Sequence, residues 1–526
     1  MRQLTPVVFY RNVKTNLHLR GDKVYYITFA VRCIICCGLA ILSLKSSIVL
    51  GQDSSRLRFA IHTIRADDTA LRLVREAGFS WVVQLLEWRE VEPAPGRKVW
   101  EYPDVLVQGC EYYGLNLALR LDHPPNWAVQ PAGDEQVPVD VTAYARFVRE
   151  VAERYRHRVQ AYIIWNEPNL SEEWLGQRPD PAAYTALLKA AYHAVKAADS
   201  EAIVVSAGLA PTNELSDQAV DDRVYLQNMY EVAARHYFDV LGAHPYGFAY
   251  SPDDLSEAHE GLNFARLSQI RDIMIRNGDK TKPVWATEMG WTVSTVPESK
   301  AWQRVTPEQQ AAFLVRSFEI AMERWPWLQL MAVWNLDAKS GQAHIAGYRI
   351  VDDEYRPLPA YRALAAMNKP VQAFRQTRSG VQGAVQVIAA DVVVHLGDSP
   401  TVNPGWSPLY CDTAPCRAWR GHFYVLATSN LPNMISSLKM EIMQVEEQGN
   451  LVRINGKALI PQAIPLRSRP DFVTSWTTAS MRIPPGVLRV GYNEIGLRAS
   501  PRLVPYQGEV RFESFQVRNI RIVSAD

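Results

Sequence analysis

The stretch Ile163-Ile164-Trp165-Asn166-Glu167-Pro168-Asn169 places a carboxyl group directly after an apolar, β-like run of residues. Similar runs recur on both sides of it between Arg56 and about Met367, and amphipathic helical patterns such as Pro181–Ala198 separate them. This alternation is typical of parallel strands joined by crossover helices. The eight runs are Leu57–His62, Trp81–Leu86, Leu115–Leu121, Gln160–Trp165, Ala202–Ala207, Asp239–His244, Pro283–Thr287 and Gln329–Trp334.

Eight strand–helix units predict an α/β fold, a (β/α)8 TIM barrel over residues 51–369. They occupy about 310 residues, and such barrels range from about 250 residues to more than about 400 with insertions. A doubly wound open sheet is the alternative, but it usually carries a glycine-rich phosphate turn after its first strand. The segment Ile61-His62-Thr63-Ile64-Arg65 has no glycine, so we expect the sheet to close into a barrel.

An all-β part follows Lys369-Pro370, where the helical periodicity stops. Short alternating runs separated by turn residues predict a β-sandwich accessory domain over residues 370–526, which is an ordinary size for one domain. Its expected strands are Val385–Ala389, Asp391–Leu396, His422–Thr428, Leu451–Ile454, Val487–Val490, Glu494–Leu497 and Phe515–Ile522.

Residues 1–50 have the pattern of an export signal. Basic residues precede the apolar run Val24–Leu44, whose length is close to the roughly 20 residues that span a bilayer. Ile48-Val49-Leu50-Gly51 is no clear cleavage site, so a cleaved signal peptide and an uncleaved membrane anchor both remain open. In either case we expect the globular part outside the cytoplasm, secreted or held at the membrane by this segment.

Charge and cysteine content narrow the possible partners. The chain has 56 Lys and Arg against 55 Asp and Glu, a formal net charge of +1, and no basic run interleaved with aromatics. Nucleic acid is therefore not an expected partner. Cys411 and Cys416 lie five residues apart in a loop rich in Pro and Gly, and we expect them to form a disulfide after export. Two buried free thiols are the alternative.

Chemistry in a barrel is expected at the carboxyl ends of its strands. Glu167 follows the fourth run, and Glu288 follows the seventh. Strands four and seven face one another across the barrel mouth, so we expect the two carboxyl groups about 5 Å apart, the separation that retaining glycosidases use. At that distance each carboxylate disfavours ionisation of the other, which keeps one as an acid while its partner is a nucleophile. One such glutamate alone is more often a helix N-cap or a surface charge.

The motif Trp165-Asn166-Glu167-Pro168-Asn169 resembles clan A of the glycoside hydrolases, which are retaining glycosidases with this barrel fold. The resemblance implies Glu167 as acid/base, Glu288 as nucleophile and a carbohydrate as substrate. It also implies that Asn166 binds the 2-hydroxyl of the sugar. Trp334, in Ala332-Val333-Trp334-Asn335, matches the aromatic floor beneath that sugar.

Further segments are similar to the same clan. His244-Pro245-Tyr246 resembles its H-P-Y element, which implies that His244 and Tyr246 point toward the two carboxylates. Trp88–Pro93 with Gly96 resembles the segment after strand two, in which Glu92 is structural. The order of motifs and the appended sandwich are most similar to family 39, which includes β-xylosidases, iduronidases and exopolysaccharide-degrading endoglycosidases.

The sandwich itself is similar to galactose-binding-like domains, through the Asn455-Gly456 hairpin and the turn Gly491-Tyr492-Asn493. Trp406, Trp419 and Trp476 are the candidate platforms if this domain binds carbohydrate. A purely structural domain is the alternative, because a fold alone does not supply a function.

The second strand departs from the clan pattern. Many members carry an arginine there that hydrogen-bonds the nucleophile and keeps it ionised, whereas this chain offers Gln84 at about that place. Either Arg58 or Arg120 supplies the cation, or the register assigned to this strand is wrong. Gln84, Asp122 and Trp291 are further candidates for residues of the substrate cleft.

Other chemistries lack their signatures. His62 stands alone on the first strand, where metal-dependent barrel hydrolases commonly carry His-x-His, so we expect no metal or other cofactor. There is no Gly-x-Ser-x-Gly elbow and no Walker-type phosphate loop. Two alternatives to a hydrolase remain: a non-catalytic carbohydrate-binding or structural protein, and a transglycosidase that uses the same two glutamates.

Overall fold

The computed structural model describes the barrel region almost continuously and the carboxyl-terminal region in segments. The described residues are 57–130, 137–294, 298–338, 343–370, 372–375, 386–389, 394–396, 418–425, 436–443, 450–459, 476–499, 501–503, 510–512 and 515–524. The expected export segment and the pair Cys411 and Cys416 lie outside them, so both remain predictions. None of the helices in the described ranges combines the length and the hydropathy that crossing a bilayer requires.

Eight parallel strands form one sheet in the order β5-β4-β3-β2-β1-β8-β7-β6. A parallel bridge between Val205 and Val240 connects β5 to β6, so the sheet meets itself as a barrel. Each strand overlaps one of the eight predicted runs, which confirms the predicted barrel. The strands are β1 (Arg58–Thr63), β2 (Trp81–Glu87), β3 (Asn116–Asp122), β4 (Ala161–Ile164), β5 (Ile203–Ser206), β6 (Leu241–Ala243), β7 (Val284–Met289) and β8 (Leu328–Val333).

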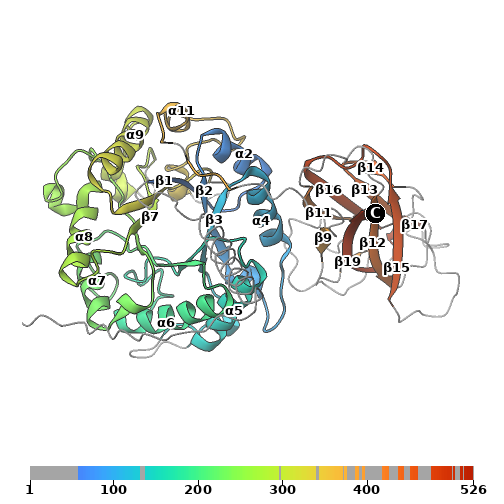
Figure 1. Cartoon of the computed structure of the whole chain (residues 1–526), viewed down its shortest axis with the longest axis horizontal. Helices are drawn as coiled ribbons and strands as arrows, with labels where there is room; N and C mark the ends of the chain where they lie inside the picture. The colour runs from blue at the N-terminus through green and yellow to red at the C-terminus, as the bar shows by residue number, and fades with distance from the viewer. Residues whose placement is uncertain are drawn as a thin grey trace, which may run out of the picture. The chain divides into compact units, whose positions relative to one another are not determined.

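Helices cover the outside of this ring of strands (Figure 1). Their starts follow from local capping: the Asp180 side chain accepts hydrogen bonds from two backbone N–H groups of α6, and Thr306 and Gln309 form the capping box of α9. The helices are α2 (Asp68–Glu76), α3 (Trp88–Val91), α4 (Glu101–Tyr113), α5 (Val141–Arg154), α6 (Pro181–Ala198), α7 (Asp222–Glu231), α8 (Leu267–Arg276), α9 (Pro307–Arg324), α10 (Ala343–Ala346) and α11 (Pro359–Ala366). Short 3₁₀ turns are η1 (Asn126–Ala128), η2 (Ala234–His236), η3 (Ala258–Gly261), η4 (Phe264–Arg266) and η5 (Glu298–Gln303).

Alternate strand residues point into the barrel and form a packed inner core. Val83 of β2 and Ala118 of β3 belong to this inner cluster. Because successive side chains of a strand point to opposite faces, residues two positions further along also point inward. This parity places Leu85 and Arg120 at the mouth of the barrel and leaves Gln84 on the outer face of β2.

Two antiparallel sheets form the carboxyl-terminal β-sandwich. One has the order β10-β19-β12-β15 with β9 beside β19, and the other has the order β11-β16-β13-β14. Side chains of both sheets, among them Leu438 and Ile495, share one apolar core, as a sandwich requires. The strands are β9 (Gln386–Ala389), β10 (Val394–Leu396), β11 (Ala418–Val425), β12 (Ser436–Met443), β13 (Leu451–Ile454), β14 (Lys457–Ala458), β15 (Thr477–Ile483), β16 (Gly491–Arg498), β17 (Pro501–Leu503), β18 (Val510–Phe512) and β19 (Phe515–Ser524).

The sandwich also corrects several expectations. Val487–Val490 is a turn rather than a strand. Trp419 is 1% exposed, so it belongs to the core and is not a platform for sugar. The guanidinium carbon of Arg518 lies 4.1 Å from the centroid of the Trp476 ring. Trp406 lies outside the described residues.

Candidate active site

The two glutamates of the predicted site lie at the carboxyl ends of β4 and β7. Glu288 belongs to β7 itself, and Glu167 follows β4 by three residues. Trp165 and Glu167 have positive φ angles of 74° and 36°. Residues other than glycine adopt such backbone angles only when the surrounding structure enforces them. The Glu167 N–H donates to the Gly208 carbonyl at 3.1 Å and anchors this bend.

The two carboxyl groups face one another closely. Oxygen atoms of Glu167 and Glu288 and a ring nitrogen of His244 all lie within 4.8 Å of one another. This matches the predicted approach of the two carboxyl groups, and it is close to the separation of about 5–5.5 Å between the carboxyl groups of retaining glycosidases. The same three side chains form the one group among the described residues whose donor atoms are close enough to share a metal ion.

Arg120 of β3 is the cation beside Glu288. Its Nη1 donates to Glu288 Oε1 and, at 3.0 Å, to Asn166 Oδ1, while its Nε lies 2.8 Å from Asp122 Oδ2. Burial alone would lower the pKa of Arg120, but the carboxylates of Asp122 and Glu288 raise it above its ordinary value. Of the two arginines considered for this place, Arg58 lies at the opposite end of β1, within 6 Å of the rings of Trp81 and Trp285.

His244 and Tyr246, which follow β6, contact the two carboxylates as the resemblance implies. His244 Nδ1 is 2.7 Å from Glu167 Oε1 and 3.7 Å from Glu288 Oε2. The Tyr246 hydroxyl donates to Glu288 Oε2 at 2.6 Å. Burial would lower the pKa of His244, but the charges of Glu288 and Glu167 raise it above its ordinary value.

A cleft of about 500 Å³ opens above these groups. Five of the predicted residues line it, namely Asn166, Glu167, Tyr246, Glu288 and Trp334. Trp334 is half-buried, and its ring meets the edge of His62 with ring centroids 4.6 Å apart. A volume of this size is in the range of small-molecule and sugar sites.

Three predicted cleft residues, Gln84, Trp291 and Asp122, do not line the cleft. Gln84 faces outward, where its Oε1 accepts from Thr63 Oγ1 at 2.6 Å and its Nε2 donates to the Leu85 carbonyl at 2.9 Å. Trp291 is fully buried and donates to the Tyr250 carbonyl. Both are wrong as substrate-binding residues, because neither lines the cleft.

Asp122 lies beneath the cleft rather than in its wall. It is 2% exposed and holds Arg120 on one side and, at 2.6 Å, the Nδ1 of His123 on the other. Burial would raise the pKa of Asp122, but Arg120 and His123 lower it below its ordinary value. Asp122 therefore orients two cleft residues without reaching the cleft itself.

Glu92 has the structural position that was expected. It is fully buried, and its carboxylate accepts hydrogen bonds from the Trp88 indole N–H and the Gly96 backbone N–H.

Two further cleft residues carry no signal in the sequence. Tyr348 lines the cleft from the segment after β8, with its ring 5.4 Å from that of Tyr246. Glu173, in the segment after β4, adds a further carboxyl group; burial, followed by the charge of Glu167, raises its pKa to about 7. Both residues lie in loops beyond the strand ends, where strand patterns give no guidance.

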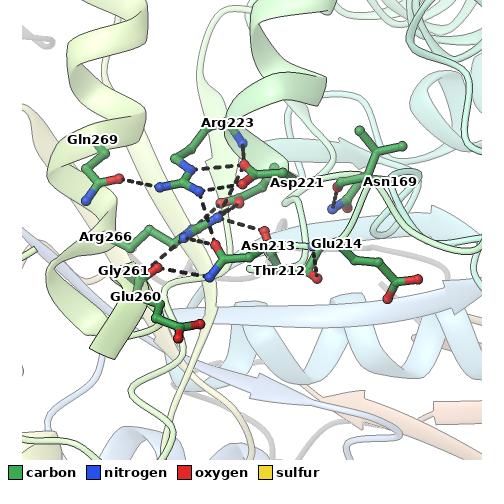
Figure 2. Close-up of polar contacts among 12 residues, drawn as sticks. Asn169, Thr212, Asn213, Glu214, Asp221, Arg223, Glu260, Gly261, Arg266 and Gln269 are labelled. Atoms are coloured by element: carbon green, nitrogen blue, oxygen red, sulfur yellow. Dashed lines mark hydrogen bonds and ion pairs between the residues drawn. The ribbon is translucent and has the colours of Figure 1, made fainter. Parts of the chain in front are cut away.

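A buried polar network fixes the loops that follow β5 and β6 (Figure 2). Arg266 is 1% exposed and pairs through Nε and Nη2 with the Asp222 carboxylate. Its remaining N–H groups donate to Asn213 Oδ1 at 3.0 Å and to the carbonyls of Thr212 and Gly261 at 2.7 and 3.1 Å. One guanidinium thus holds residues that lie more than 40 positions apart in the chain.

Asn169 connects the segment that carries Glu167 to the same loops. Its Nδ2 donates to the carbonyls of Ala210 and Val220, both at 2.9 Å, and its Oδ1 accepts from the Ala210 N–H. The last residue of the quoted motif is therefore structural, and it fixes the backbone two residues beyond Glu167 (Figure 2).

Fold and site together define a (β/α)8 barrel with two carboxyl groups facing each other in a cleft at its carboxyl-terminal mouth. No family model and no curated protein matches the chain. Among solved structures, a family 39 glycoside hydrolase from the gut symbiont Bacteroides cellulosilyticus WH2 is 17% identical, with a TM-score of 0.46 over 85% of this chain and 82% of that one.

Two further solved structures show the same level of similarity. A glucosidase from Croceicoccus marinus is 13% identical, with a TM-score of 0.46 over 85% of this chain and 96% of that one. Xylanase 10B from Thermotoga maritima is 15% identical, with a TM-score of 0.42 over 59% and 94%. Similarity at this level does not extend to function, for which the site geometry is the argument.

Proposed function

We propose that the protein is a retaining glycosidase that cleaves O-glycosidic bonds of oligo- or polysaccharides through a covalent glycosyl-enzyme intermediate. The observation that carries the proposal is the approach of Glu167 and Glu288 to within 4.8 Å, inside a cleft large enough for a sugar. An inverting enzyme needs a wider gap of about 6.5–9.5 Å, because a water molecule must fit between the carboxylate and the sugar.

The partners of each carboxyl group support different roles for them. Glu288 accepts hydrogen bonds from the Arg120 guanidinium and the Tyr246 hydroxyl, which hold its two carboxyl oxygens in place. A charged carboxylate held by two donors is suited to attack the anomeric carbon. The Oε1 of Glu167 lies 2.7 Å from the Nδ1 of His244, a side chain that can itself donate and accept a proton. Glu167 is therefore suited to act as the general acid and base.

The proposed reaction has two steps. In the first, Glu288 forms a bond to the anomeric carbon while the bond to the leaving oxygen breaks, and Glu167 gives its proton to that oxygen. In the second, Glu167 takes a proton from water, whose oxygen displaces Glu288 and restores the carboxylate. Asn166, held by Arg120, is placed to bind the 2-hydroxyl, and Trp334 forms the floor beneath the same sugar.

The azide experiment distinguishes the two roles. We expect Glu288→Ala to lower turnover of an activated aryl glycoside by about 10³-fold or more, because the covalent intermediate is lost. Azide added to this variant should restore some rate and give a glycosyl azide of inverted configuration. Glu167→Ala should still form the intermediate from a good leaving group, and azide should then give a product of retained configuration.

The anomeric configuration of each azide product is read by NMR. Retained product from Glu288→Ala together with inverted product from Glu167→Ala would reverse the assignment of roles. Unchanged activity of either variant would remove that residue from the mechanism. Wild-type protein that turns over no member of a panel of aryl glycosides and polysaccharides would favour the non-catalytic alternative, and transfer of sugar to added oligosaccharides in place of water would identify a transglycosidase.

A further inference from the structure

One loop after β6 contacts the two carboxylates and an aromatic ring of η5 at every second residue. His244 bonds the Glu167 carboxylate, Tyr246 bonds Glu288, and Phe248 packs against Trp302. Gly247 lies between the last two against the Trp291 ring, where an added Cβ would come within 2.0 Å of ring atoms. The loop is thus fixed in a single path from the catalytic pair to Phe248.

Phe248 and Trp302 form an aromatic stack at the end of this path. Their rings are nearly parallel, at 19°, with centroids 5.4 Å apart. Phe248 has a positive φ of 53°, a costly conformation for a bulky residue and one that clusters at ligand sites. The strained backbone presents the Phe248 ring to one face of Trp302.

Trp302 is 48% exposed although one of its faces is covered. Single exposed apolar residues are common and need no explanation by themselves. The position of Trp302 is different, because Lys300 and Gln303, on either side of it in η5, both line the cleft. Trp302 itself does not line the cleft, but this supported and partly exposed ring lies between two residues that do.

We propose that Trp302, supported by Phe248, is a platform for a second sugar ring of the same carbohydrate chain, beyond the sugar that rests on Trp334. A flat aromatic face suits the apolar C–H face of a pyranose with equatorial substituents, as in β-linked chains. The inference rests on the proposed function, and it assigns the substrate class: oligo- or polysaccharides, bound through at least one sugar besides the one at the catalytic pair.

The test is a comparison of KM values for short and long substrates. The probes are the aryl monoglycoside that the wild-type protein cleaves best and soluble oligosaccharides of two to six residues of that sugar. For Trp302→Ala we expect the ratio of the hexasaccharide KM to the aryl glycoside KM to rise about tenfold, which corresponds to about 1.4 kcal/mol. Trp302→Phe, which keeps a flat ring, should recover most of the loss.

Leu255→Ala is the matched control. Leu255 lies in the loop after β6, is 75% exposed and does not line the cleft, so its removal should leave the KM ratio unchanged. Thermal unfolding of all variants checks that they fold. An unchanged ratio in Trp302→Ala, or an equal rise in Leu255→Ala, would overturn the platform while leaving the proposed function intact. Failure of the wild-type protein to cleave any glycoside would instead overturn the proposed function and this inference with it.

Discussion

At the scale of single residues, the site is organised by one buried arginine. Arg120 contacts the proposed nucleophile, the side chain of Asn166 and the carboxylate of Asp122, and it is 5% exposed. A buried guanidinium is stable only when its charge is compensated, and these carboxylates compensate it. Asn166 and Glu288 are therefore positioned by the same group.

We expect Arg120→Met to lower kcat/KM for an aryl glycoside about a hundredfold or more, on the scale seen when one preorganised donor is removed from an active site. Arg58→Met is the control, since Arg58 is a half-buried barrel arginine that lies against Trp81 and Trp285.

Steady-state kinetics measures kcat/KM for both variants. The control variant should keep kcat/KM within about twofold even if it lowers the stability, because single mutations act mainly on stability when they lie away from the site. Equal losses in both variants would show that Arg120 contributes through folding and not through Glu288.

At the scale of elements, the sequence predicts which segments are strands but not which strand face points inward. Strands of a parallel barrel are buried on both faces, so they lack the polar and apolar alternation that would reveal the face. Gln84 illustrates the consequence: a shift of one position exchanges the inner face for the outer one, and Leu85 occupies the cleft position instead. Glu167 was expected from its position after the fourth strand, and Asn166, Tyr246 and Trp334 were expected from the resemblance of their motifs to clan A.

The loop after β6 gives a prediction at this scale. Gly247→Ala should lower the free energy of unfolding by about 1–3 kcal/mol, because the added Cβ would overpack against the buried Trp291 ring. It should also lower kcat, since His244 and Tyr246 belong to the same loop. Chemical denaturation and kinetics are the measurements.

Gly496→Ala is the control for that substitution. Gly496 lies in β16, and an added Cβ there would meet no atom within 4 Å. The free energy of unfolding of the Gly496→Ala variant should therefore differ from that of the wild-type protein by less than about 0.5 kcal/mol. A Gly247 variant as stable and active as the wild-type protein would contradict the rigid path described for this loop.

At the scale of the whole molecule, the division into a barrel and a sandwich was predictable, but the strands of the sandwich were less so. β12 alternates between buried and half-buried residues, yet its half-buried positions include Lys439 and Glu441, residue types that are depleted in strands. Such a segment resembles a helix as much as a strand in the sequence. Its pairing with β15 and β19, which are distant in the chain, supplies the information that the local pattern lacks.

The amino-terminal segment gives the prediction for the whole chain, and we propose that it directs export. Expressed at full length in a bacterial host, the protein should be found in membranes or outside the cytoplasm, because basic residues precede the apolar run Val24–Leu44. Deletion of residues 1–50 should leave it in the cytoplasm. Cell fractionation with an antibody measures both, and full-length protein in the soluble cytoplasmic fraction would contradict export.

The position of Arg120 has an evolutionary consequence. The cation that many clan A glycosidases carry on the second strand is supplied here from the third, whose inner face adjoins it in the barrel. A comparison that aligns strand with strand would count the arginine as lost, although the charge beside Glu288 is retained. Two substitutions can move the charge between neighbouring strands if the second arginine arises before the first is lost, because both positions then carry the charge during the exchange. Ancestral sequences with arginine at both inner positions, 85 and 120, would be evidence for this exchange.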